Sequence, residues 1–508
     1  MLDKRGSEAG GAGGPGDKGP RAHLTATLIL ACLGQFMVIL DVSVVNVALP
    51  AIRHGLHFSE QDLQWVVNAY TVTFAGFLLL GGRAADLIGR RRVFVGGLVL
   101  FALASLAGGF AQSQVMLIAA RAIQGLGAAV VAPASLTILT TTFTEPAERN
   151  RAVGIWGAMG GAGGAAGVLL GGILTDIAGW RWILFINVPI GLIAAFLTTL
   201  YVAEGRAPAR TKNFDVAGAL TATIGLSLLV LGIVRTDVTG WSAASTVALL
   251  AAGVGLLIVF LAIEGRFAKA PLMPLRIYAS RTLSAANVVV LFVGAASFAM
   301  WFFVSLYLQE VLGYSPIKAG LAFLPMTLCI VAGSVLASRY VMRIGAKPML
   351  IAGMLAQAAG LILFARVAVN GGYLSDVIAP SLLVAIGIPL SFVPSTISAV
   401  HGVAGREAGL ASALVNTSRL VGGALGLAVL AAIATARTNS DLRHSSGGVH
   451  ATNVALTSGF HVAFAVAAGL ALAGALVAAF GMPRVVVGKA ARRAPEPESA
   501  APPVETAA

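Results

Sequence analysis

Two charged residues lie inside long apolar stretches of this sequence. Asp41 follows Leu-Gly-Gln-Phe-Met-Val-Ile-Leu, and Arg121 lies within Leu-Ile-Ala-Ala-Arg-Ala-Ile-Gln-Gly. A charge at the centre of a membrane helix costs about 2.5–3.5 kcal/mol, so such residues usually handle protons, ions or substrate. A buried carboxylate beside an arginine can exchange a proton, because burial favours its neutral form and the arginine its ionised form. The alternative for Arg121 is a side chain that reaches the membrane surface.

The elements that position these residues follow from composition. Hydrophobic residues make up 57% of 508 and charged residues only 11%, whereas a soluble domain has about 25% charged residues. Fourteen apolar runs are long enough to cross a hydrocarbon core about 30 Å thick as helices. The runs lie near 24–49, 63–82, 93–111, 115–143, 152–175, 182–203, 215–235, 243–264, 283–309, 318–340, 348–367, 374–400, 408–434 and 458–481.

The distribution of basic residues gives a topology. With the N-terminus in the cytoplasm, the cytoplasmic loops and tails hold 25 of the 34 Lys and Arg residues and the external loops hold 7. Orientation follows this bias, so both termini are expected in the cytoplasm. The net charge of +13 is then a topology signal and does not indicate a nucleic-acid partner. The tails at 1–22 and 483–508 have compositions typical of disorder.

This topology places the two charges at similar depth. The fourth span enters from outside near Gln114, which puts Arg121 about 10 Å in at 1.5 Å per residue. The first span runs outward, and Asp41 lies about 13 Å before its expected end near Pro50. We therefore expect both residues in the outer half of the membrane.

An internal repeat divides the chain. Residues 82–92 align with residues 338–348, so that Gly89 matches Gly345 and Arg83 matches Arg339. Both segments follow the second helix of a six-helix set. The sequence predicts two six-helix halves, 23–203 and 266–482, with an inserted helix pair at 204–265. Parallel repeats of this kind place a substrate site between them near the midplane. Chance similarity between loops rich in Arg and Gly is the alternative.

The first repeated loop is interpreted as a conformational latch, made of Gly82, Asp86, Gly89, Arg90 and Arg91. The glycines permit tight turns, and Asp86 can accept hydrogen bonds from the arginines. The alternative is the ordinary excess of positive charge in cytoplasmic loops.

This segment resembles the loop 2–3 signature of the major facilitator superfamily, although Ala84 stands where Leu is usual and Leu87 where Arg is common. The Arg121 segment resembles the helix-4 motif of that superfamily. Together with the Asp41 segment, the stretches 180–191, 307–320 and 408–419 resemble its fourteen-helix drug:proton antiporter family. The resemblance covers about residues 24–481. It implies an all-α integral membrane protein in which helices 1 and 4 line a central cavity, so that Asp41 and Arg121 face that cavity.

Glycines recur in the fifth span, and two interpretations of them stay open. Gly163, Gly167, Gly171 and Gly172 are spaced for close helix packing. The same stretch resembles the antiporter motif of the family, with Val168 where proline is expected.

Seven further residues are candidates for lining a substrate cavity, and each is equally compatible with a packing role. They are Gln35, Asn46, Asn68, Tyr70, Gln124, Trp301 and Arg419. For Arg419 the two readings are contact with substrate or proton, and hydrogen bonds to a neighbouring helix.

The function expected is proton-coupled efflux of amphipathic, apolar or cationic small molecules, such as drugs or antibiotics, across a bacterial plasma membrane by alternating access. The alternative is a proton-coupled importer of nutrients or metabolites. No enzyme activity, cofactor or metal site is expected. The protein is expected to be a monomer. The sequence contains no G-x-x-x-x-G-K-[ST] phosphate loop, so ATP-driven pumping is not expected.

Overall fold

The computed structural model describes residues 20–204, 215–268, 271–401, 403, 407–444 and 448–483. Within these ranges the chain is helical, and fourteen helices are long and apolar enough to cross a membrane. The predicted all-α membrane fold is confirmed. The tails predicted at 1–22 and 483–508 lie almost entirely outside the described residues.

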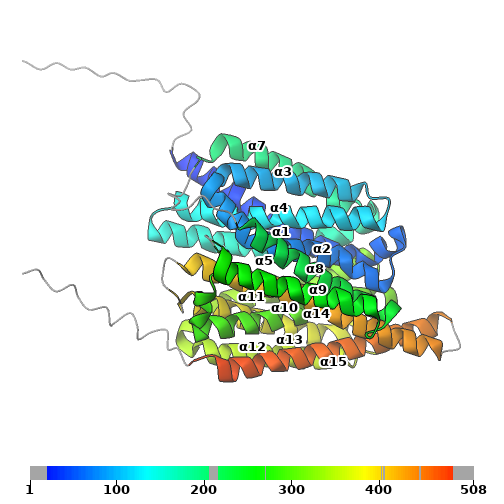
Figure 1. Cartoon of the computed structure of the whole chain (residues 1–508). Coiled ribbons are helices and arrows are strands. Elements are labelled where there is room, and N and C mark those ends of the chain that lie inside the picture. Colours follow the sequence, from blue (N-terminus) through cyan, green and yellow to red (C-terminus); the bar gives the residue numbers. More distant parts are fainter. Residues whose placement is uncertain are drawn as a thin grey trace, which may run out of the picture.

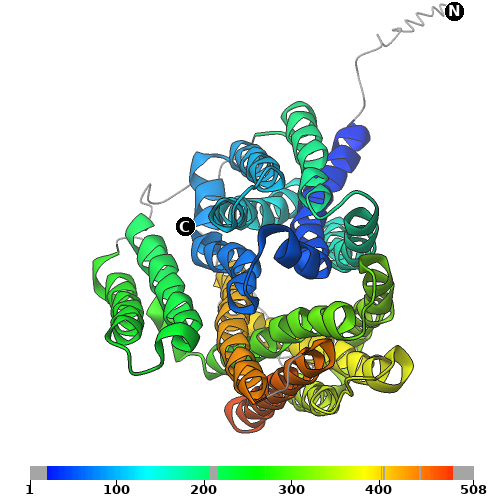
Figure 2. The same ribbon diagram turned by 90° about the vertical axis from the view of Figure 1, so that its right-hand side faces the viewer.

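The first seven helices form one side of the molecule (Figures 1 and 2). They are α1 (Pro20–Leu56), α2 (Glu60–Ile88), α3 (Arg90–Gly109), α4 (Gln114–Thr142), α5 (Pro146–Ile177), α6 (Trp182–Phe185) and α7 (Asn187–Tyr201). Short side chains start several of them: Ser59 caps α2 by accepting a hydrogen bond from the Asp62 amide, and Ser113 caps α4 in the same way.

The opposite side contains the last six spans. They are α10 (Arg281–Leu306) with its π-helical continuation η3 (Tyr307–Val311), α11 (Pro316–Ile344), α12 (Ala346–Phe364), α13 (Ile378–His401) preceded by η4 (Tyr373–Val377), α14 (Ala408–Arg443) and α15 (Val449–Gly481). A short turn, η2 (Leu275–Ala279), precedes α10.

Between them in sequence come α8 (Val216–Thr239) and α9 (Ala244–Ala262), the latter continued by η1 (Ile263–Phe267). This pair lies at the flank of the bundle, where Figure 2 shows it in green at the left. Val230 of α8 packs with Val72 of α2 and Ala428 of α14, so the pair covers the line where the two sides meet. The exact domain limits stay a prediction.

Three predicted spans are too short. α1 continues through Pro50 to Leu56, α14 continues to Arg443, and α15 begins at Val449. The extra turns of α14 and α15 are polar enough to escape a search for apolar runs, but they bond to each other. Arg437 donates to Ser458 at 3.0 Å and Thr438 to the Ala455 carbonyl at 3.3 Å. This hairpin projects beyond the bundle in Figure 1.

The bundle has two ends, which we name by the chain. The terminal face is the end where α1 begins and α15 ends, and the distal face is the opposite end. At the terminal face, single glycines connect α2 to α3 and α11 to α12: Gly89 has φ 123° and Gly345 has φ 91°. Only glycine adopts such angles without strain. The two repeated loops therefore have the same construction, which supports the predicted repeat.

Near the distal face, Pro50 gives α1 an unusual carbonyl group. Proline has no N–H, so the carbonyl of Asn46, four residues earlier, lacks its helical donor. Ser305 of α10 donates to that carbonyl at 2.6 Å. Gln309 of η3 donates to the neighbouring carbonyl of Val47 at 2.8 Å. A proline in one side of the molecule thus provides an acceptor for the other side.

Charged groups extend this distal contact. The Glu310 carboxylate lies 3.2 Å from Nε2 of His54 and 3.6 Å from Nη1 of Arg53, both on the last turn of α1. The end of α1 is therefore joined to α10 and η3 by both hydrogen bonds and charge. We call this set of contacts the distal seal.

Candidate functional site

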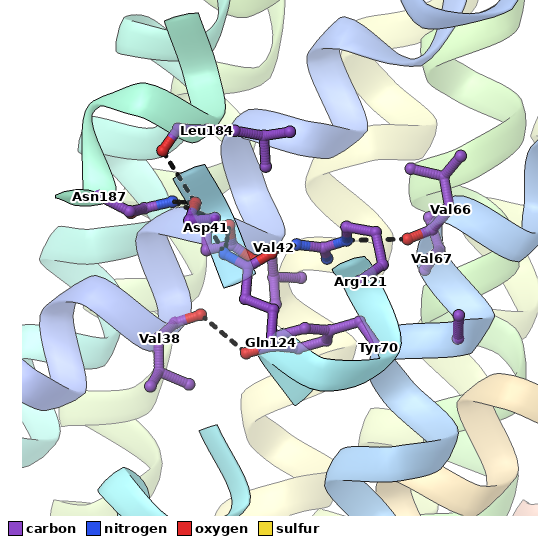
Figure 3. Close-up of polar contacts among 12 residues, drawn as sticks. Val38, Asp41, Val42, Val66, Val67, Tyr70, Arg121, Gln124, Leu184 and Asn187 are labelled. Carbon is purple, nitrogen blue, oxygen red and sulfur yellow. Dashed lines mark hydrogen bonds and ion pairs between the residues drawn. The ribbon is translucent and has the colours of Figure 1, made fainter. Parts of the chain in front are cut away.

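Asp41 and Arg121 form an ion pair in the interior of the first seven helices (Figure 3). The distance from Nη1 of Arg121 to Oδ2 of Asp41 is 2.5 Å, and their side chains are 1% and 0% exposed. Nε of Arg121 also donates to the Val66 carbonyl of α2 at 3.0 Å. The pair therefore joins α1 to α4, and α4 to α2. Arg121 does not reach toward the membrane surface.

Three neutral polar side chains complete the network around the carboxylate. Oδ1 of Asp41 accepts hydrogen bonds from Gln124 at 2.7 Å and from Asn187 at 3.0 Å. Ser105 accepts from the same two amides at 3.1 and 3.2 Å and donates to the Leu184 carbonyl at 2.8 Å. Gln124 also accepts from Arg121 at 2.7 Å. We call Asp41, Arg121, Gln124, Asn187 and Ser105 the charge network.

This arrangement surrounds the Asp41 carboxylate with hydrogen-bond donors. Asp41 faces three donors, one of them a guanidinium, and donors of this kind stabilise the charged form. The pair is neutral as a whole, which offsets part of the cost of burying two charges, whereas loss of one partner leaves the other uncompensated. The carboxylate thus joins α1 to both α4 and α7.

Tyr70 of α2 packs against the arginine. Its ring centroid lies 4.4 Å from Cζ of Arg121, within the range of a cation–π contact. Its hydroxyl donates to the Val38 carbonyl of α1 at 3.4 Å. Tyr70 therefore contacts both helices that supply the ion pair.

The remaining predicted cavity residues lie outside the charge network. Asn46 donates to the Val42 carbonyl in its own helix, and Asn68 to a glutamine one turn before it. Gln35 is half-buried on α1. Trp301 of α10 packs against the ring of Phe323, with centroids 4.9 Å apart. Arg419 lies on α14 and hydrogen-bonds Asn416.

Two members of the charge network were missed by sequence reasoning. Asn187 begins α7, and Ser105 lies in the middle of α3. Both are fully buried polar residues in apolar runs. Their position as polar residues within apolar runs is visible in the sequence, but it does not indicate that their side chains point toward Asp41.

The glycines of α5 bring three helices together. A Cβ atom at Gly163, Gly167 or Gly171 would lie within 3 Å of α1, at Phe36, Ser43 and Val44 respectively. A Cβ atom at Gly172 would lie 2.7 Å from the Pro316 carbonyl of α11. Gly161 faces α11 as well, with Val331 at 2.5 Å.

One face of α5 thus packs closely on the helix of Asp41, and another packs on the opposite side of the molecule. Close packing is shown by these distances, and a role of the stretch in antiport stays a prediction. α5 is one continuous helix through Val168, which stands where the antiporter motif has proline.

Comparison with known proteins identifies the family. The model of the Major Facilitator Superfamily matches residues 31–427 and, in a second match, residues 287–506. The chain belongs to the major facilitator superfamily. Among its relatives, the cephamycin export protein of Amycolatopsis lactamdurans is 42% identical over 431 residues, covering 84% of this chain and 89% of that protein. The puromycin resistance protein of Streptomyces alboniger is 38% identical over 464 residues, covering 91% and 92%.

Solved structures of the superfamily fold agree. A bacterial homologue of the human lysosomal transporter Spinster has a TM-score of 0.65 at 18% identity, covering 92% of this chain and 99% of that one. A D-xylose–proton symporter has a TM-score of 0.66 at 13% identity, covering 91% and 98%. These likenesses concern the fold alone. The protein is a multi-pass membrane transporter of the major facilitator superfamily and not an enzyme.

The loop that carries the superfamily signature makes a charged contact at the terminal face. Glu204, just after α7, lies 3.6 Å from Nε of Arg91 and 3.5 Å from Nε of Arg92. A Cβ atom at Gly89 would lie 2.5 Å from Oε1 of Glu204, so the glycine leaves room for that carboxylate.

The carboxylate that contacts Arg91 and Arg92 is therefore Glu204, which follows α7 and does not belong to the loop between α2 and α3. The Asp86 side chain lies outside the part of the chain that the structure describes. Gly82 and Arg90 lie at the facing ends of α2 and α3, and the role of the whole set as a latch stays a proposal.

Proposed function

We propose that this transporter exports amphipathic small molecules across a bacterial plasma membrane in exchange for protons, with both termini in the cytoplasm. The observation that carries the proposal is the enclosed Asp41–Arg121 pair, a titratable carboxylate held by three donors from two other helices. An intramembrane carboxylate with such partners is typical of proton-coupled transport. Nothing in the proposal requires a cofactor or a second subunit.

The direction and the substrate class are supported by the relatives. One is named for cephamycin export and another for puromycin resistance, and both align over most of their length. We therefore propose export of antibiotic-like organic molecules and not import of nutrients.

The orientation is supported by charge. The connections at the terminal face contain more Lys and Arg than those at the distal face. Together with both tails they hold 25 of the 34 Lys and Arg residues. This face is therefore assigned to the cytoplasm by the positive-inside rule.

The proton step follows from the charge network. While Asp41 is ionised, it holds α1 against α4 and α7. Protonation removes the charge that Arg121 and the two amides contact, and the network must rearrange because a neutral carboxyl group accepts fewer hydrogen bonds. α1 then moves relative to α4. Since α5 packs without a gap on both α1 and α11, displacement of α1 reaches the opposite half through α5.

Alternating access then requires the distal seal to open. Ser305, Gln309 and Glu310 hold α1 against the other half in the conformation described here. The distal seal is then one gate of a rocking cycle.

The experiment uses inverted membrane vesicles with an acidic interior. A susceptibility panel in an efflux-deficient host first selects a compound that the protein exports. Antiport predicts that the compound accumulates in the vesicles and the proton gradient is dissipated, whereas proton symport predicts the opposite movement. Asp41→Asn should abolish uphill accumulation while exchange of labelled for unlabelled compound continues.

A matched control is Asp176→Asn, because Asp176 is an exposed carboxylate at the distal end of α5. This control should transport normally. Unimpaired uphill accumulation by Asp41→Asn would refute the assignment of the proton to Asp41.

A further inference from the structure

Arg419 is the third charged residue deep within the membrane spans. It lies 11 residues after the start of α14, about 17 Å along the helix axis. Its backbone packs closely on α10, because a Cβ atom at Gly294 would lie 2.1 Å from the Arg419 carbonyl. Its side chain is half-buried. The next residue, Leu420, packs in one apolar cluster with Tyr70 of α2. Arg419 therefore lies where the two halves meet.

The guanidinium has few partners there. Nε and Nη2 of Arg419 both donate to Oδ1 of Asn416, at 3.3 and 3.0 Å. Cζ lies 5.8 and 5.6 Å from the ring centroids of Phe298 and Phe392. A guanidinium has five N–H donors, so three of them have no acceptor among the described residues. Asn416 holds one edge of the Arg419 guanidinium, and the three other N–H groups are available to a ligand.

The charge of Arg419 is also uncompensated. Arg121 is neutralised by Asp41 at 2.5 Å. Among the residues that the structure describes, no carboxylate lies within ion-pair distance of Arg419, which forms only the contacts given above. A lone cation in a medium of low dielectric constant is unfavourable, and an anionic ligand relieves this cost.

The surroundings fit an amphipathic ligand. Phe298 and Phe392 come from two different helices, α10 and α13, and both are half-buried. Aromatic side chains provide apolar contact area beside the charged group, and a few placed polar groups then fix the orientation of the ligand. Asn416 is the polar group that fixes the guanidinium.

We propose that Arg419 binds an organic anionic group, such as a carboxylate, of the transported molecule, while Phe298 and Phe392 contact its apolar part. The proposal rests on the proposed function, because it takes the ligand to be the exported compound. It also changes the expected substrate class. Asp41 is closed off by its partners, so the free charge that the described interior offers to a substrate is positive. Amphipathic acids, and not cations, are the predicted ligands.

A matched pair of probes tests the proposal. Dansylglycine carries a carboxylate, and dansylglycinamide is its neutral isostere. Binding of each is measured by fluorescence to the purified full chain in phosphatidylcholine nanodiscs, with empty nanodiscs as the blank and no pH gradient. Hydrogen bonds to a charged group contribute about 1.5–3 kcal/mol, so Arg419→Gln should weaken acid binding about 10-fold to 100-fold. Amide binding should change less than 3-fold.

Two more variants separate recognition from folding. Arg419→Lys keeps the charge and should retain a preference for the acid, although a weaker one because the fork geometry is lost. Arg437→Gln, on the same helix but in a half-exposed pair with Asp441, should bind both probes normally. Gel filtration and thermal unfolding identify any variant that is misfolded. If Arg419→Gln is misfolded, the preference of Arg419→Lys for the acid over the amide tests the proposal.

The results are decisive in either direction. A wild-type protein that binds both probes equally, or binds neither, overturns the proposal, as does a parallel loss of both in Arg419→Gln. Phosphatidylglycerol is then added to the nanodiscs to test for a lipid site. If this lipid, at its concentration in a native membrane, competes with dansylglycine, the anion bound by Arg419 is a lipid headgroup and not the transported molecule. Asp41→Asn should keep the acid preference while losing uphill export, so a failure of proton coupling is not confused with a failure at Arg419.

Discussion

Removal of one charge from the buried pair should destabilise the protein far more than removal of both. In Asp41→Asn, the Arg121 guanidinium stays buried with neutral acceptors, among them the Val66 carbonyl and Gln124, but without a compensating negative charge. An uncompensated buried charge costs about 3–5 kcal/mol, whereas replacement of both partners is often nearly neutral. Asp41→Asn/Arg121→Gln should therefore recover at least half of the stability lost in Asp41→Asn.

The assay is reversible SDS-induced unfolding in mixed micelles, from which the four members of the double-mutant cycle give one coupling free energy. The coupling is the sum of the two single costs less the cost of the double variant. With about 3–5 kcal/mol for each single variant and at most half of one such cost for the double, we expect a coupling of at least about 4 kcal/mol. The control cycle uses Arg437 and Asp441, whose side chains are 52% and 27% exposed. An exposed pair of this kind contributes about 0–1 kcal/mol.

The transport readout separates stability from coupling. The double variant should fold and bind ligand but should not accumulate substrate uphill, because no titratable group is left in the charge network. Additive effects of the two substitutions on the free energy of unfolding would refute the reasoning from the ion pair. Uphill transport by the double variant would refute the assignment of the proton.

The remaining predictions concern α5 and the distal seal. Gly167→Val should destabilise the fold by about 1–3 kcal/mol through overpacking and reduce transport, because even a Cβ atom at Gly167 would lie 2.4 Å from Ser43. The control is Gly160→Val, which should have little effect because a Cβ atom at Gly160 meets open space. Stability and initial transport rates check both, and equal behaviour would contradict the packing argument. Glu310→Gln should weaken the distal seal, so that Asn46→Cys reacts faster with an impermeant maleimide added on the distal side; an unchanged rate would mean that the charged contact does not hold this side closed.

The sequence predicted that Asp41 and Arg121 lie at similar depth, and it predicted the spans by their apolar length; the direct ion pair is seen in the structure. Gln124 was predictable as a neighbour of Arg121, because residues three apart share a helix face. Asn46 lies five residues after Asp41, which turns it about 140° around α1 at 3.6 residues per turn. The two side chains therefore have different partners: Asp41 lies in the charge network, and Asn46 donates to the Val42 carbonyl of α1. Helix periodicity separates residues on one helix in this way.

Periodicity does not relate different helices to each other. The direction in which Asn187 of α7 and Ser105 of α3 point depends on how these helices pack against α1, and packing is a property of all three. Similarly, the glycines of α5 indicated close approach, but their spacing did not say that Gly167 faces α1 and Gly172 faces α11. The end of α1 was misplaced because Pro50 was taken as a stop, whereas this helix continues past it.

Pro50 has a consequence for the speed of the cycle. The carbonyl of Asn46 contacts Ser305 because the proline leaves it without a helical donor. When the two halves separate, that carbonyl loses its partner but α1 loses none of its own backbone bonds, so the helix does not have to unwind. A contact worth about 0.5–1.5 kcal/mol is strong enough to favour one conformation and weak enough to break at each turnover. In the proposed cycle, selection for faster or slower turnover can thus act on a single proline far from the residues proposed to meet proton or substrate.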